Sequence, residues 1–296
     1  MRFTRTRATL VCASLLLTLA ACGDAGSDDE GSDVSADTDA ASELEDGTRM
    51  KEIADDGKIV IGVKYDQPGL GFKGATDDVP SGFDVEIAKI LVSKLGIDPE
   101  SDNVEWKETI SDNREPFLKS GEVDLVLASY SITDERRAEV GQAGPYFLTG
   151  QQVLVKKDSG ISSVDDLKGK EVCSVTGSTS IDNAEAEGMK PRGFDTYSEC
   201  RDQVLDGAID AMTTDGSILL GYAALNPDDL EVVGEPFSEE RIGVGYSPES
   251  PEMCQWITDT LQESMDNGDW AKAFEATLGK SGAETPEPPQ MDPCKS

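Results

Sequence analysis

Polar side chains that could bind a charged small molecule recur directly after short apolar runs of the kind that form strands. Hydroxyls and free N–H groups at helix starts accept anions, an arginine offers two donors to a carboxylate, and an aspartate supplies the opposite charge. Ligands of parallel sheets sit beyond the carboxyl ends of the strands, so we expect these side chains to converge. An anion site beside an acid suits a zwitterion such as an α-amino acid. The candidate residues are Lys64, Ser111, Arg114, Ser129, Ser131, Arg136, Thr179 and Asp215.

Each of these residues has an ordinary explanation when it is taken alone. Serine or threonine after a strand is a common helix N-cap, and so is an aspartate before a helix. A single lysine or arginine is most often a solvated surface group. The interpretation as a binding site therefore depends on all the positions converging on one cleft.

The elements that would position these residues alternate along the chain. Short apolar runs predict buried strands, and a periodicity of 3.6 residues predicts helices between them. This order implies parallel sheets covered by helices, and the restart of the pattern after Gly150 predicts two lobes. We expect strands at residues 58–63, 103–106, 123–128, 152–155, 171–175 and 208–212. We expect helices at residues 84–95, 251–265 and 270–278, and another that ends at residue 120 with Gly121 as its cap.

The N-terminus has the pattern of a signal peptide, which we assign to residues 1–21. Three arginines precede a short apolar core, and small residues lead to Cys22. The Leu-Ala-Ala-Cys ending resembles the bacterial lipobox, which implies that Cys22 carries lipid and holds the chain at the outer face of the cell membrane. Residues 23–48 contain acids and no base, so we expect residues 22–49 to form a disordered tether. The alternative is a plain signal peptide with an incidental cysteine.

The composition excludes several classes of function. The formal net charge is -33, so nucleic acid binding through phosphates is not expected. The chain has no histidine, which excludes His-based catalytic triads and His-ligated zinc. We expect no metal and no cofactor.

Cys173, Cys200, Cys254 and Cys294 form an even set that suits an oxidising compartment. Four cysteines allow three pairings, of which we favour Cys173–Cys200 with Cys254–Cys294. Four free buried thiols are the alternative.

Several motifs in order resemble the amino-acid-type (family 3) bacterial extracellular solute-binding proteins. They are residues 81–88 (SGFDVEIA), 121–124 (GEVD), 131–136 (SITDER), 144–146 (GPY) and 267–270 (NGDW). The segments at 64–71, 173–180, 197–200 and 213–215 are similar to those of the actinobacterial glutamate-binding lipoproteins of ABC importers. This closer similarity also supports the Cys173–Cys200 pairing.

The resemblance implies a role for each candidate residue. Arg136, with Ser129, Ser131 and Thr179, would bind the α-carboxylate of the ligand, and Asp215 would bind its α-ammonium group. Lys64, Ser111 and Arg114 would line the side-chain pocket. An unpaired cation in a dry cleft is costly, so two cations there favour an acidic ligand, glutamate or aspartate. One departure from the family pattern is Ala128, where some relatives have a hydroxyl.

The family also implies a two-lobed periplasmic-binding-protein-like α/β fold of type II, with a mostly parallel sheet in each lobe. Lobe 1 would comprise residues 50–147 and 241–296, and lobe 2 residues 151–237. The hinge would have two crossings, near residues 146–150 and 238–242. Closure on the ligand would be recognised by ABC permease subunits that work with a cytoplasmic ATPase.

Three alternatives stay open at this stage. The same closure could serve a membrane signalling partner, and the ligand could be glutamine or asparagine. A few relatives of this fold are dehydratases, but the cleft's one clear acid is Asp215, which the ammonium group would occupy. We therefore expect a binding protein and not an enzyme.

Overall fold

The computed structural model describes residues 34–294. The predicted signal peptide, the lipid-bearing Cys22 and the first part of the tether lie outside these residues. No helix among the described residues is long and apolar enough to cross a membrane.

The first sheet, which we call lobe 1 together with its helices, has the strand order β4-β1-β5-β12-β6. Four strands point the same way, and β12 is the reversed strand between β5 and β6. The strands are β1 (Ile59–Val63), β4 (Val104–Glu108), β5 (Leu125–Ser131), β6 (Gly141–Thr149) and β12 (Glu240–Tyr246). The helices are α2 (Arg49–Asp56), α3 (Phe83–Lys94), α4 (Arg114–Ser120), α5 (Asp134–Arg137), α9 (Met253–Asn267) and α10 (Asp269–Ala276).

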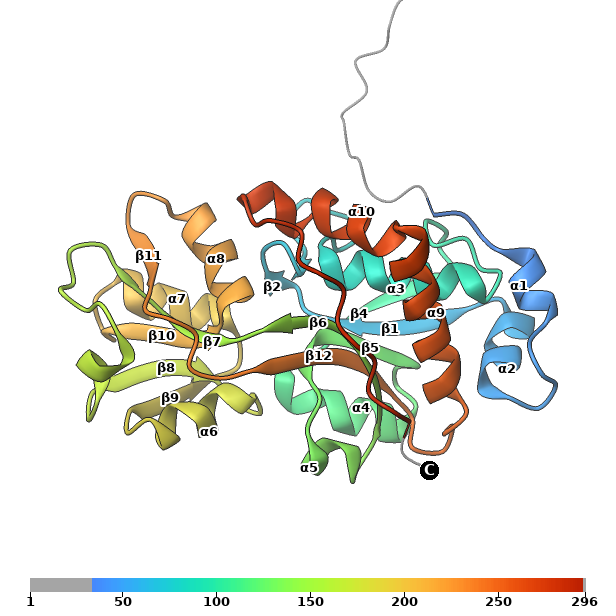
Figure 1. Cartoon of the computed structure of the whole chain (residues 1–296), viewed down its shortest axis with the longest axis horizontal. Coiled ribbons are helices and arrows are strands. Elements are labelled where there is room, and N and C mark those ends of the chain that lie inside the picture. Colours follow the sequence, from blue (N-terminus) through green and yellow to red (C-terminus); the bar gives the residue numbers. More distant parts are fainter. Residues whose placement is uncertain (1–33, 295–296) are drawn as a thin grey trace, which may run out of the picture. The chain divides into compact units, whose positions relative to one another are not determined.

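The second sheet, with its helices, forms lobe 2 and has the strand order β11-β7-β10-β8-β9. Its reversed strand is β7, and α7 and α8 lie on one face with α6 on the other (Figure 1). The strands are β7 (Gln151–Lys156), β8 (Glu171–Val175), β9 (Lys190–Phe194), β10 (Ala211–Asp215) and β11 (Leu230–Val233). The helices are α6 (Thr179–Ala186), α7 (Tyr197–Leu205) and α8 (Gly216–Leu225), with a short 3₁₀ helix η2 (Val164–Leu167). The expected fold class, a two-lobed α/β protein with one mostly parallel sheet in each lobe, is confirmed.

The chain passes between the two sheets twice, once at Gly150 and once along residues 234–239. The two crossings touch, because a Cβ on Gly150 would lie 2.6 Å from the main-chain oxygen of Ser238. Gln151 adds two bonds there, since its N–H donates to Ser238 Oγ and its carbonyl accepts from Phe237. The reversed strands β7 and β12 therefore both begin at a crossing.

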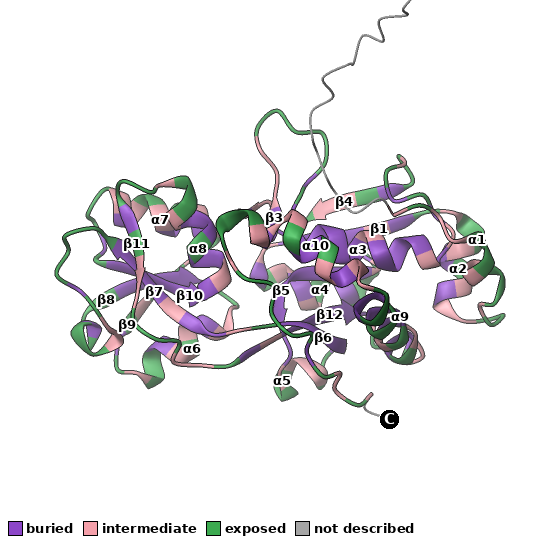
Figure 2. Cartoon of the chain, turned by 45° about the horizontal axis from the view of Figure 1, so that its top comes forward, coloured by how far each residue is buried: buried purple, intermediate pink, exposed green. Residues whose placement is uncertain are grey.

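Every residue of β5 is buried (Figure 2), and alternate residues of this strand pack in different core clusters. In β5, Leu125 and Leu127 pack in the same core cluster as the residues of α3, whereas Val126 and Ala128 pack with Leu118 of α4. This alternation, with a period of two residues, places the end of β5 between two helices. The polar residues that follow Leu127 are thus held at the edge of lobe 1.

The structure corrects the expected tether in its C-terminal part, because residues 34–48 are ordered against lobe 1. Asp37 caps a short helix, α1 (Thr38–Ser42), and its carboxylate forms an ion pair with Lys94 at 2.9 Å. The two larger apolar side chains of this stretch, Val34 and Leu44, pack against the main core. The acidic composition predicted disorder, but these few anchors suffice to dock the segment.

One predicted strand is displaced along the sequence. Residues 208–212 were expected to form it, whereas β10 runs from Ala211 to Asp215. The turn after α7 extends through Gly207, which has a φ of 71° and so delays the strand. The β-branched Thr213 and Thr214 continue it. Asp215 is therefore the last residue of a strand.

Both favoured disulfides are present, Cys173–Cys200 in lobe 2 and Cys254–Cys294 between α9 and the C-terminal segment. The second disulfide closes a loop with a sequence separation of 40 residues. The chain-entropy model assigns about 4 kcal/mol of stability to a loop of this length.

We expect the double variant Cys254→Ala and Cys294→Ala to lose about 3–4 kcal/mol of unfolding free energy, because the unfolded chain gains the freedom that the loop removes. Urea denaturation monitored by tryptophan fluorescence measures the loss. Addition of a reducing agent to the double variant reports on the other disulfide and serves as the comparison. An unchanged urea midpoint in the double variant would contradict the prediction.

Candidate functional site

Seven of the eight predicted residues line a single small cavity between the two lobes. The eighth, Lys64, lies directly behind the wall and donates to Ser111 Oγ at 2.9 Å. Five further residues of the cavity wall were not predicted from the sequence: Gln67, Ser178, Ser180, Tyr197 and Ile218. Ala128, the departure from the family pattern, also lines the wall.

Strand ends and helix starts deliver these side chains to the cavity. Lys64 directly follows β1, Ser129 and Ser131 end β5, and Asp215 ends β10. Thr179 begins α6, and its hydroxyl lies 3.5 Å from that of Ser131 in the other lobe. The predicted convergence of strand ends is therefore what the structure shows, with both lobes contributing.

Two arginines lie close to one aromatic ring. The guanidinium carbons of Arg114 and Arg136 lie 4.4 and 4.9 Å from the ring centre of Tyr130. The hydroxyl of Tyr130 donates to Glu115, whose carboxylate also pairs with Arg136 Nε at 3.3 Å. Both guanidinium groups then donate across the cleft to the main-chain oxygen of Gly177, at 3.0 and 2.9 Å. Contacts with the Tyr130 ring and with the Glu115 carboxylate therefore hold the two like-charged guanidinium groups close together, which contacts with the ring alone would not do.

Lys64 is a buried cation with a weak partner. The residue is 3% exposed, and its ammonium group donates to the neutral hydroxyl of Ser111. Burial, and next the nearby charge of Arg114, lowers the pKa of Lys64 to about 7. An anion bound near the Lys64 ammonium group would raise its pKa again.

Asp215 is the matching buried acid on the lobe 2 side. Burial, and next the charge of Glu240, raises the pKa of Asp215 to about 8. Its side chain makes no capping bond to α8, so the ordinary explanation of this aspartate as a helix N-cap is wrong. The carboxylate is instead part of the cavity wall.

A buried network under the cavity includes a residue that the sequence analysis took for an ordinary helix start. Asp84, in the first turn of α3, accepts from the main-chain N–H of Ser129 at 2.8 Å and from the hydroxyl of Tyr146 at 2.6 Å. Ser129 has a φ of 45°, in the left-handed region that non-glycine residues rarely adopt. Its hydroxyl donates to Gln67 Oε1 at 2.6 Å. The buried carboxylate thereby orients two residues of the wall.

Glu240 is another buried acid, which the sequence analysis did not predict as a site residue. Its two carboxylate oxygens accept from Thr179 at 3.1 Å and from Asn183 at 2.9 Å, both on α6. It stands at the start of β12, where the chain re-enters lobe 1. It therefore links one crossing to the helix whose first residue lines the cavity.

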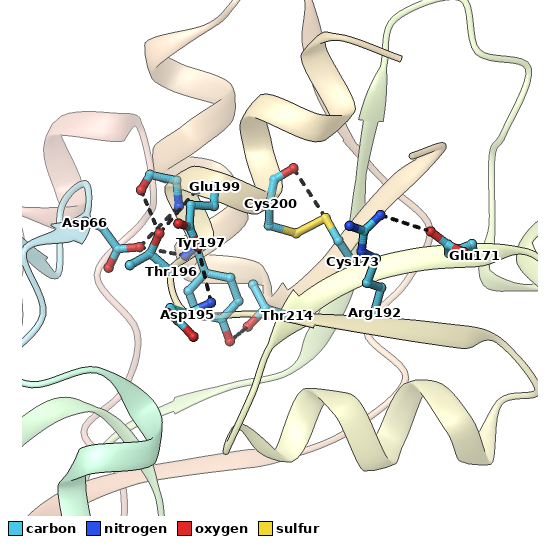
Figure 3. The surroundings of a disulfide bond; sticks show 11 residues. Asp66, Glu171, Cys173, Arg192, Asp195, Thr196, Tyr197, Glu199, Cys200 and Thr214 are labelled. Atoms are coloured by element: carbon cyan, nitrogen blue, oxygen red, sulfur yellow. Dashed lines mark hydrogen bonds and ion pairs between the residues drawn. A yellow bond between two sulfur atoms is a disulfide. The ribbon is translucent and has the colours of Figure 1, made fainter. Parts of the chain in front are cut away.

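Further contacts join the lobes around the cavity. Asp66 of lobe 1 accepts from the main-chain N–H groups of Tyr197 and Ser198, at 2.7 and 3.2 Å, and so caps α7 from the opposite lobe (Figure 3). Tyr222 of α8 donates to the main-chain oxygen of Asp66. Gly177 has a φ of 77° and approaches Asp112 so closely that a Cβ would lie 2.2 Å from its carboxylate. The lobes are thus closed on each other at this edge.

Metal binding finds no support in the described part of the chain. Residues 34–294 contain no group of three or more acids or cysteines arranged to hold a metal ion. The donors in the cavity wall are hydroxyls, guanidinium groups and an amide, which suit an organic ion.

Comparison with known proteins identifies the class of this chain. The model of the bacterial extracellular solute-binding proteins, family 3, matches residues 59–280, and the chain belongs to this family. The glutamate-binding protein GluB of Corynebacterium efficiens is 36% identical over 290 residues, which cover 94% of this chain and 92% of that protein. The glutamine-binding protein of Geobacillus stearothermophilus is 37% identical over 255 residues, with coverages of 84% and 96%. The solved solute receptor for L-cysteine of Neisseria gonorrhoeae is 31% identical with a TM-score of 0.73, covering 81% of this chain and 97% of that one.

We expect Gly177→Ala to hinder closure, because the added Cβ would meet Asp112 of the other lobe. Gly169→Ala is the matched control, since Gly169 has a φ of 75° and open space around it. Both variants should lose about 1–2 kcal/mol of stability from left-handed strain. Only Gly177→Ala should show a larger radius of gyration in small-angle X-ray scattering with a mixture of the common amino acids. Identical scattering from the two variants would refute the role of Gly177.

Proposed function

We propose that this protein captures an acidic α-amino acid, glutamate or aspartate, by closing its lobes and delivers it to an ABC importer. The observation that carries the proposal is a pair of buried ionisable groups, Asp215 in the wall of the cavity and Lys64 directly behind the wall. Each is buried without a full partner of opposite charge, and a zwitterion with a second carboxylate supplies both partners. Family membership and the similarity to a glutamate-binding protein support the same ligand class.

The groups common to all α-amino acids would be held at the Arg136 end of the cavity. Thr179 and Ser131 offer hydroxyls beside the Arg136 guanidinium, and Asp215 offers a carboxylate for the ammonium group. In the closed structure Arg136 donates to the carbonyls of Ser131 and Gly177. Exchange of a carbonyl for the ligand's carboxylate is favourable because charged acceptors form the stronger bonds.

The side chain of the ligand would end near Lys64. Arg114 is committed to main-chain oxygens at Ser111, Ala128 and Gly177, whereas the Lys64 ammonium has a hydroxyl partner. Lys64 is therefore the cation with donors to spare, because an ammonium group has three. Of the two cations predicted for the side-chain pocket, Lys64 would therefore meet the ligand, and Arg114 would brace the wall.

Location and delivery complete the proposal. A lipid on Cys22 would hold the protein at the outer face of the cell membrane, as the N-terminal pattern predicts. Closure by a ligand that touches both lobes gives a permease two distinct conformations to discriminate. Binding of glutamine is the competing specificity, since a glutamine-binding relative is as similar as a glutamate-binding one.

We expect the ratio of glutamate affinity to glutamine affinity to fall about tenfold per pH unit above pH 7. The ligand-free protein loses the Lys64 proton near that pH, so Lys64 must then take up a proton from solvent when glutamate binds and the ion pair forms. The titration of Asp215 affects both ligands alike, since both present the same ammonium group, and it cancels in the ratio. Isothermal titration calorimetry between pH 6 and pH 9 measures the ratio.

Lys64→Met should abolish this pH dependence and bring the two affinities close together, whereas Lys107→Met, at a partly buried position of β4 outside the cavity wall, should leave both unchanged. Tighter binding of glutamine than of glutamate by the wild-type protein at pH 6 would sink the acidic-ligand proposal.

We expect Arg136→Ala to weaken binding of glutamate and glutamine alike by roughly a hundredfold or more, because each loses its α-carboxylate partner. Arg192→Ala is the control, as Arg192 is an exposed residue of β9 whose ion pair with Glu171 is 3.8 Å long. Calorimetric titration of both variants provides the measurement. Retention of affinity in Arg136→Ala would remove this residue from the site.

A further inference from the structure

Gln67 is a residue of the cavity wall whose hydrogen bonding is incomplete. Its side chain is 1% exposed, and its Oε1 accepts from the hydroxyl of Ser129 at 2.6 Å. Its Nε2 finds no partner anywhere in residues 34–294. Buried amide donors are nearly always bonded, so a donor left over at a cavity wall points to a ligand atom as its acceptor.

The orientation of this amide follows from the neighbouring bonds. The Ser129 hydroxyl has one proton and two acceptors in reach, Gln67 Oε1 at 2.6 Å and Asp84 Oδ2 at 3.3 Å. Gln67 Oε1 is the closer of the two by 0.7 Å, so the hydroxyl proton is assigned to it. This fixes Oε1 on the protein side, and the donor Nε2 is the free end.

The backbone places Gln67 on the Lys64 side of the cavity. Gln67 lies in the two-residue strand β2 (Asp66–Gln67), which pairs with β3 (Gly71–Phe72). Gly71, opposite Gln67, lies against Lys64, because a Cβ there would be 2.7 Å from the Lys64 main-chain oxygen. The preceding residue, Asp66, caps α7 of the other lobe, so the strand is held from both sides.

We propose that Gln67 recognises the terminal group of the ligand side chain, with Nε2 donating to one oxygen of a carboxylate that Lys64 contacts. This inference rests on the proposed function and names a residue that selects acid over amide. Two donors facing one terminal group match the two oxygens of a carboxylate. A carboxamide has an NH₂ group in place of one of these oxygens. This NH₂ group would face one of the two protein donors, and neither it nor that donor would have an acceptor.

The test compares glutamate and glutamine binding in Gln67→Met and Gln67→Glu by calorimetry at pH 6. Methionine keeps the length of the side chain but cannot donate, so the affinity ratio of glutamate to glutamine should fall about tenfold. Glutamate at this position puts an acceptor where the donor was, so the ratio should fall further, by roughly a hundredfold. Gln255→Met, on the exposed face of α9, should leave the ratio unchanged.

An unchanged ratio in both Gln67 variants overturns the inference, and so does an equal loss for both ligands, which a disturbed Ser129 would produce. These outcomes are separate from the fate of the proposed function. A wild-type protein that prefers glutamine refutes the acidic ligand, yet Gln67→Glu would still shift the ratio if Gln67 contacts the terminal group. A wild-type protein that prefers glutamate, with an unchanged ratio in the variants, refutes the role of Gln67 alone.

Discussion

The buried carboxylate of Asp84 is the constraint on which the site depends. It lies in the first turn of α3 and bonds to Ser129 at the end of β5 and to Tyr146 in β6. The carbonyl of Tyr146 in turn accepts from the indole of Trp270 at 2.8 Å. Burial raises the pKa of Asp84, against the bonds it accepts. Left-handed strain of the kind Ser129 carries costs about 1–3 kcal/mol and persists only where neighbours impose it, as Asp84 does here. Loss of this carboxylate would leave a buried N–H unpaired and release the end of β5.

The two other buried ionisable groups, Lys64 and Asp215, differ from Asp84 because neither has a full partner of opposite charge. Asp84 has two protein partners, whereas burial lowers the pKa of Lys64 to about 7 and raises that of Asp215 to about 8. Groups in this condition do not stabilise the fold, since burial of an unpaired charge is costly. They favour whatever neutralises them, and they stand on opposite lobes. A ligand that pairs with both therefore stabilises the closed arrangement over the open one by its difference in affinity for the two.

Local sequence patterns predicted much of this structure. The strand at residues 171–175 has the expected bounds, and Gly121 caps α4 in a left-handed conformation as expected. Polar residues after strands gave most of the cavity wall, because the carboxyl ends of parallel strands meet at one edge. Gln67 was not predicted as a site residue, since its strand has only two residues and no periodicity to read. Glu240 was missed because its partners on α6 are 57 and 61 residues away in sequence. Asp84 was predicted only as the first residue of a helix, and the packing of β5 and β6 around it reveals its burial.

Overall similarity cannot decide between an acidic and an amide ligand, as relatives that bind one or the other are about equally similar to this chain. A carboxylate and a carboxamide have nearly the same shape, so discrimination must come from charge and from the direction of hydrogen bonds. Arg136 and Asp215, in their proposed roles, bind groups that every α-amino acid shares and cannot discriminate. The hydrogen bonds of Asp84 to Ser129 and Tyr146 hold the strands in place. In the proposed binding mode, selectivity depends on the few side chains at the ligand's far end, where Lys64 would supply the charge and Gln67 the free donor. The direct bonds of Lys64 and Gln67 stay within lobe 1, so substitution of these two residues would change what the far end of the ligand meets and leave the direct contacts between the lobes in place.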